Sequence, residues 1–182
     1  MQGHLDSPLT DQGIAQAKQV AADLHQVEFD AVYSSDLSRA KKTADIIALE
    51  HDITVRTTAM LRERYMGILQ GKTKEELSGK LQDLLYKLDR IYRAKQQKDA
   101  KHRVEPLDNL HHRTITFLRQ TAVAHQGGKV LIVTHGGVIG QLLVRMGYKN
   151  VKNYFELNID NLSSLILKSD GVDFFIEETK GI

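Results

Sequence analysis

The chain alternates between short, continuous apolar runs and longer stretches in which apolar residues recur every three or four positions. From Ile14 to Leu24 the apolar residues have the helical spacing, and the hydroxyl of Thr10 stands before them as an N-cap, which predicts a helix over residues 11–26. The same two patterns predict, in chain order, a strand over residues 29–34, a helix over 37–50, a strand over 53–57, a helix over 74–98, a helix over 107–125 and a strand over 129–134.

The last part of the chain has the pattern of a hairpin. Two β-prone runs, residues 164–168 and 174–178, flank Asp170 and Gly171, a pair that is typical of a tight turn. We expect an antiparallel hairpin at one side of the sheet. Strands that alternate with helices before it indicate an α/β sandwich.

Composition narrows the class of protein. At 182 residues the chain suits one domain with a sizeable core, and its 41% apolar and 26% charged residues are typical of a globular protein. The formal net charge of +2 predicts no general affinity for nucleic acid or for an anionic membrane. No cysteine is present, which excludes disulfides and a thiolate nucleophile. Without a signal-like start or a membrane-length apolar run, we expect a cytoplasmic protein.

The apolar run at residues 129–134 leads into His135, Gly136 and Gly137. At the carboxyl end of a buried strand, an imidazole followed by two glycines that open a helix can surround an anion with ring and backbone N–H groups. The alternative is a histidine that only forms a hydrogen bond within a tight turn.

Arg39 follows the strand at residues 29–34 and lies in the first turn of the next helix. Its planar guanidinium group can hold two phosphate oxygens at once. The alternative for this residue is a surface ion pair with Asp36.

Glu63 lies in the loop between the strand at residues 53–57 and the helix at 74–98. Close to a phosphate dianion, repulsion between like charges would raise the pKa of this carboxyl group, as a general acid requires. The alternative is that Glu63 forms an ion pair with Arg62 or Arg64.

Four segments, in this order and at these separations, resemble the histidine phosphatase superfamily, and its phosphoglycerate-mutase branch most closely. They are Gln-Gly-His-Leu-Asp-Ser-Pro-Leu-Thr at residues 2–10, Ser-Ser-Asp-Leu-Ser-Arg-Ala at 34–40, Leu-Arg-Glu-Arg-Tyr-Met-Gly at 61–67 and Thr-His-Gly-Gly at 134–137. The resemblance spans essentially the whole chain.

The resemblance implies a three-layer α/β sandwich with a mixed, mostly parallel sheet, in one domain of residues 1–182 whose segment at about 72–104 is a helical insertion or cap. It implies that Arg39 clamps the transferring phosphoryl group, that His135 donates a hydrogen bond to it, and that Glu63 protonates the leaving oxygen and then activates water. No metal and no other cofactor is implied. The pocket for a small phosphorylated substrate would be lined by Gln2, Gly3, Arg39, Tyr65 and Gly136.

Members of this family begin with a strand that ends in Arg-His-Gly, whose histidine accepts the phosphoryl group, and the 182 residues contain no such motif. We therefore expect that the first, central strand is absent, and that the chain as written is truncated at its N-terminus and inactive. His4, at a variable position of the first turn, is expected to point from the rim of the site and not to replace the nucleophile. The neighbouring strands would keep unpaired backbone groups, an edge through which a homodimer could form.

Three functions stay open on the sequence. The first is a phosphomonoesterase or a mutase, with hydrolysis favoured because the insertion is only moderate in length. The second is a non-catalytic module that binds phosphate-bearing ligands through Arg39 and His135. The third is an interaction protein that uses the open edge of the sheet for strand addition.

Overall fold

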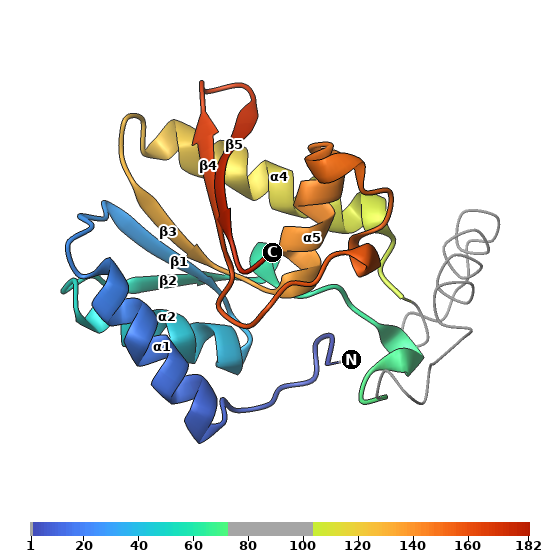
Figure 1. Ribbon diagram of the computed structural model, residues 1–182, viewed down its shortest axis with the longest axis horizontal. Helices are drawn as coiled ribbons and strands as arrows, with labels where there is room; N and C mark the ends of the chain where they lie inside the picture. The colour runs from blue at the N-terminus through green and yellow to red at the C-terminus, as the bar shows by residue number, and fades with distance from the viewer. Residues whose placement is uncertain (1, 73–103) are drawn as a thin grey trace.

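The computed structural model describes residues 2–72 and 104–182, so the predicted helix over 74–98 lies outside the described residues. A parallel sheet forms the centre, in which β1 (Ala31–Ser35) pairs with β2 (Val55–Thr58) on one side and with β3 (Val130–Val133) on the other (Figure 1). Four of the five residues of β1 are buried, whereas every residue of the wholly apolar β3 is only half-buried. Within the described residues, β3 has a strand neighbour on one side alone.

Helices cover both faces of this sheet, which confirms the three-layer prediction (Figure 1). On one face, α2 (Ser38–Leu49) packs against β1 through Ala44 and Ala48, and α1 (Asp11–Leu24) packs on α2. On the other face are α4 (Leu107–Ala124) and α5 (Gly136–Arg145). Val32 faces α2, and the next residue, Tyr33, points the opposite way, with its ring 5.3 Å from that of Phe117. This alternation of side chains along a strand separates the two layers of core.

The remaining strands, β4 (Ser164–Ser169) and β5 (Phe174–Lys180), form the expected antiparallel hairpin. Within the described residues the hairpin makes a two-stranded sheet of its own, and neither of its strands pairs with β3. Leu167 and Phe174 pack against the core between α4 and α5, so the hairpin is held by side chains. The short 3-10 helices are η1 (Ala59–Leu61), η2 (Gly67–Leu69), η4 (Tyr148–Asn150) and η5 (Tyr154–Glu156).

In the described residues, the termini of the predicted helices and strands agree with the structure to within about two residues. Across residues 2–72 and 104–182, no helix combines the length and the hydropathy that crossing a bilayer requires.

Candidate active site

Arg39 points toward the N-terminal segment. Its Nη1 donates to the carbonyl oxygen of Leu5 at 2.9 Å, and its Nη2 donates to that of Gly3 at 2.8 Å. The other three N–H groups of the guanidinium make no hydrogen bond within the described residues, so they are available to an anion. The alternative pairing with Asp36 is wrong, because the carboxylate of Asp36 accepts two hydrogen bonds from Arg62, at 2.7 and 2.6 Å.

The first turn of α2, which positions Arg39, receives its cap from a distant residue. Leu37 occupies the N-cap position and offers no side-chain acceptor. Instead, the carboxylate of Asp6 accepts a hydrogen bond from the backbone N–H of Ser38 at 3.0 Å. The N-terminal segment and the start of α2 are therefore joined through Asp6, through Arg39 and through the hydroxyl of Ser38, which donates to the carbonyl oxygen of Ser7 at 3.3 Å.

His135 lies at the N-cap position of α5, where β3 ends, and is 8% exposed. Its Nε2 is 2.8 Å from the hydroxyl oxygen of Ser35, the last residue of β1. Burial, and then the positive charges of Arg39 and Arg113, lower the pKa of His135 to about 3. The imidazole is therefore neutral near pH 7, so it can donate one hydrogen bond and accept another.

The carboxylate of Glu63 is held by two backbone N–H groups. It accepts hydrogen bonds from Arg64 N at 2.7 Å and from Gly137 N at 3.2 Å, the latter in the first turn of α5. Burial of the carboxyl group raises the pKa of Glu63, and the two N–H donors and the charge of Arg39 partly oppose this shift. The alternative ion pair with a neighbouring arginine is wrong. Arg62 pairs with Asp36, and the guanidinium of Arg64 donates to the carbonyl of Glu105 and to the hydroxyl of Tyr154.

The structure thus brings Arg39, Glu63 and His135 to one edge of the sheet. The bond between Glu63 and Gly137 joins the loop after β2 to the start of α5, and the bond between His135 and Ser35 joins β3 to β1. The charge of Arg39 acts on both other groups. It contributes to the low pKa of His135, and it partly opposes the rise that burial causes in the pKa of Glu63. An acid, a neutral imidazole and a cation at one place form a site for an anion with a nearby proton donor.

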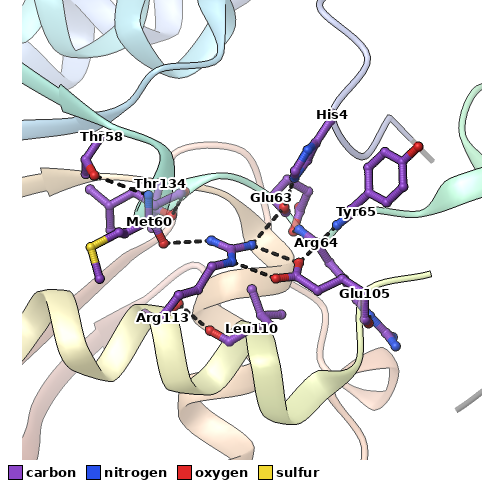
Figure 2. Close-up of polar contacts among 12 residues, drawn as sticks. His4, Thr58, Met60, Glu63, Arg64, Tyr65, Glu105, Leu110, Arg113 and Thr134 are labelled. Carbon is purple, nitrogen blue, oxygen red and sulfur yellow. Dashed lines mark hydrogen bonds and ion pairs between the residues drawn. The ribbon is translucent and has the colours of Figure 1, made fainter. Parts of the chain in front are cut away.

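The other residues expected in the pocket differ in their contacts and in their exposure to solvent. Gly3 has a φ of +55°, and a Cβ atom there would stand 2.5 Å from Oε1 of Gln70, so this turn needs glycine. The ring of Tyr65 lies 5.1 Å from that of His4, close to Glu63 (Figure 2). Gln2 is exposed, and Gly136 is an exposed residue at the first position of α5. Gly3 and Tyr65 therefore border the site, and Gly136 lies at its open side.

His4 contacts the loop that holds Glu63. Its Nε2 lies 2.7 Å from the carbonyl oxygen of Glu63 (Figure 2), and its backbone N–H donates to Gln70 at 2.7 Å. Burial lowers the pKa of His4. The inward turn depends on the positive φ of Gly3 and on Gln70, which is 66 positions away along the chain. Only the Gln-Gly pair at the start of the sequence hinted at such a turn.

Among the described residues, no group of three or more His, Cys, Asp or Glu side chains is arranged to hold a metal ion.

The family model of the histidine phosphatase superfamily (branch 1) matches residues 1–180. The chain belongs to this superfamily. Arg39, Glu63 and His135 are thus three side chains of a histidine phosphatase fold, gathered where its parallel strands end.

Two similar proteins are from Arabidopsis thaliana. The chain is 41% identical to phosphoglycerate mutase-like protein 4 over 147 residues, which cover 80% of this chain and 63% of the relative. It is 34% identical to a metal-independent phosphoserine phosphatase over 148 residues, which cover 80% of this chain and 61% of that protein. The chain matches about three fifths of the length of these curated relatives.

Solved structures of this superfamily share the fold. A mycobacterial glucosyl-3-phosphoglycerate phosphatase in complex with inorganic phosphate has a TM-score of 0.77 and is 26% identical, over 98% of this chain and 89% of that one. YhfR of Bacillus stearothermophilus has a TM-score of 0.78 and is 30% identical, over 97% of this chain and 86% of the other.

Proposed function

We propose that the protein acts on small phosphorylated compounds as a phosphomonoesterase, with Arg39, His135 and Glu63 around the phosphoryl group. The observation that carries the proposal is the buried carboxyl group of Glu63, whose pKa is raised, beside Arg39 and a neutral His135. Hydrolysis is favoured over mutase action because the expected insertion, at about residues 72–104, is only moderate in length. A phosphoserine phosphatase and a glucosyl-3-phosphoglycerate phosphatase among the relatives also support it.

Each of the three side chains has a role in this reaction. The unpartnered N–H groups of Arg39 bind the phosphate oxygens, and His135 donates a further hydrogen bond. A phosphate dianion next to His135 raises the pKa of that imidazole and so favours its protonated form, which donates a stronger, charge-assisted hydrogen bond. Glu63, whose pKa is raised by burial, gives its proton to the leaving oxygen and, as a carboxylate, takes a proton from the attacking water.

The nucleophile of this reaction is a histidine that, we propose, comes from a strand outside the 182 residues. That imidazole forms an N–P bond as the P–O bond to the leaving group breaks, and water then releases inorganic phosphate. Two facts support this proposal. The sequence contains no Arg-His-Gly, and β3 and β4 each have an edge without a strand partner in the described part of the chain.

Hydrolysis of glycerol 2-phosphate, an alkyl phosphate whose leaving oxygen needs a proton, tests the proposal, measured on the 182-residue chain and on the chain extended at its N-terminus by a strand that ends in Arg-His-Gly. We expect turnover by the extended chain alone. In it, Glu63→Gln should lower kcat by roughly 10²- to 10⁴-fold, the range for loss of a general acid–base group. Glu50→Gln, at an exposed position after α2, is the matched control. Equal rates in the Glu63→Gln variant and its parent would refute the role of Glu63.

A second candidate function is a phosphate-binding module, favoured by the three N–H groups of Arg39 that are left for an anion. Calorimetry with vanadate separates the two functions. Binding that is lost in Arg39→Met, together with no hydrolysis by either form of the chain, would favour the module. Hydrolysis by the extended chain would exclude it.

A further inference from the structure

Arg113 and Glu105 form an ion pair directly beside the loop that holds Glu63 (Figure 2). Arg113 Nε donates to Glu105 Oε1 at 2.7 Å, and Nη2 donates to Oε2 at 3.0 Å. The two side chains are only 19% and 15% exposed. Arg113 belongs to α4, the helix that packs against η1, and Glu105 lies just before that helix. Two-point pairing of this kind fixes the direction of the guanidinium plane.

The same guanidinium also holds the backbone of the loop. Its Nη1 donates to the carbonyl oxygen of Met60 at 2.6 Å, and its Nη2 donates to that of Glu63 at 3.0 Å. The first carbonyl lies in η1, and the second belongs to the candidate acid itself. A charged donor with a fixed plane, bonded to two carbonyls three residues apart, restricts how that stretch can move.

Glu105 completes the connection from the other side. Its Oε2 accepts a hydrogen bond from Tyr65 N at 3.1 Å, and its own N–H donates to the carbonyl of Tyr65 at 2.7 Å. Its carbonyl accepts from the Nε of Arg64 at 2.7 Å. The loop on both sides of Glu63 is therefore bonded to one ion pair.

We propose that Arg113, oriented by Glu105, is the positioning residue for the acid of this site, because it fixes the backbone of Glu63 and so keeps the carboxyl group against the start of α5. The role of Arg113 in catalysis rests on the proposed function, whereas its hold on the backbone of Glu63 does not. Among residues 2–72 and 104–182, the carboxyl group itself accepts hydrogen bonds only from the N–H groups of Arg64 and Gly137, and the second of these bonds is 3.2 Å long. A small shift of the loop would break it.

The simpler reading is an ion pair that only stabilises the fold. A double variant separates the two, since removing both charges of a buried pair removes the penalty of leaving one charge alone. If the pair only stabilises, Arg113→Met/Glu105→Met restores whatever Arg113→Met damages. If Arg113 positions the acid, the double variant recovers stability against urea while Glu63 stays displaced. Arg119→Met, an exposed position on the same helix, is the matched control.

The readout that needs no activity is the amide resonance of Gly137 in the 182-residue chain. In the parent chain this N–H donates to Glu63, so its chemical shift should follow the ionisation of Glu63 as pH rises. We expect most of that pH-dependent shift to be lost in Arg113→Met/Glu105→Met and in Arg113→Lys, which keeps the charge without the planar fork. An unchanged shift in a folded double variant would overturn the proposal. If the double variant does not fold, an unchanged shift in Arg113→Lys would do so.

The kinetic readout uses the extended chain. There we expect kcat to fall on the order of 10²-fold in Arg113→Lys with little change in KM, as for an acid displaced by about 1 Å. No turnover by the parent extended chain would count against the proposed function. The Gly137 resonance would still decide whether Arg113 positions Glu63, so the two failures are distinguishable.

Discussion

The fold keeps His135 neutral where a free histidine is partly charged. Its pKa is lowered to about 3, first by burial and then by the nearby arginines. In the unfolded chain the same imidazole takes up a proton near pH 6.5. As pH falls, the unfolded state therefore binds a proton that the native state does not, and the native state loses stability. Between pH 7 and pH 5 this group should cost the fold about 2 kcal/mol.

Comparison with His135→Asn isolates that effect. Glu63 must be taken into account because burial raises its pKa, so acidification changes its contribution to stability in the opposite direction. Urea unfolding at pH 7 and pH 5 gives the free energy of unfolding for each chain. We expect the parent chain to lose about 2 kcal/mol more than His135→Asn over this range. The same pH dependence in both chains would mean that His135 is not held neutral.

At the scale of elements, the start of α5 sets the place of the acid. A Cβ atom at Gly137 would stand 2.3 Å from Oε1 of Glu63, whereas one at Gly136 would stand 3.8 Å from its nearest neighbour, Ile159. Gly137→Ala should therefore displace the carboxyl group, which lies at the flexible end of its side chain. We expect a change of less than about 1 kcal/mol in stability, because that end can rotate away.

In the extended chain, we expect Gly137→Ala to lower kcat on the order of 10²-fold through the displaced acid. Gly136→Ala is the steric control, and its unfolding midpoint and Gly137 amide shift should match the parent. A Gly137→Ala variant with parental kcat would show that the acid does not need its contact with α5.

Much of this could be predicted from the sequence because it is local. The helices have clear apolar periodicity, Thr10 does cap α1, and Asp170 with Gly171 does mark the hairpin. Arg39, Glu63 and His135 could be placed at one edge because each follows a strand of a parallel sheet. The alternatives for Arg39 and Glu63 were wrong because the charged neighbours in sequence bond to other residues, Asp36 to Arg62 and the guanidinium of Arg64 to Glu105 and Tyr154.

The partners of the site residues could not be predicted, because they are set by contacts between distant segments. The contact of His135 with Ser35 spans 100 positions, and that of Arg113 with the carbonyl of Glu63 spans 50. Nothing in the spacing of Glu105 and Arg113 along the sequence indicated that they hold the loop of Glu63. The inward turn of His4 could not be predicted either, because it also depends on a contact with a distant segment.

At the scale of the whole molecule, the described strands form two separate sheets. The parallel piece ends at β3 and the hairpin begins at β4, and within the described residues neither edge has a strand partner. The residues Val130–Val133 are wholly apolar, as suits a strand with neighbours on both sides, yet each is only half-buried. The edge of β3 is thus the place where an additional strand would complete the core.

Hydrogen exchange of the β3 amides tests this idea. In the 182-residue chain, the amides of β3 that do not bond to β1 should exchange much faster than those of β1, which has strands on both sides. The N-terminally extended chain should slow exchange at the same β3 amides and leave β1 unchanged, because the new strand supplies their acceptors. Pairing of two copies through this edge would also slow exchange, but only as protein concentration rises, so a dilution series separates the two. Slow exchange of all β3 amides in the dilute 182-residue chain would show that the edge is already closed, and a strand from outside these residues could not then bring the nucleophile to Glu63 and His135.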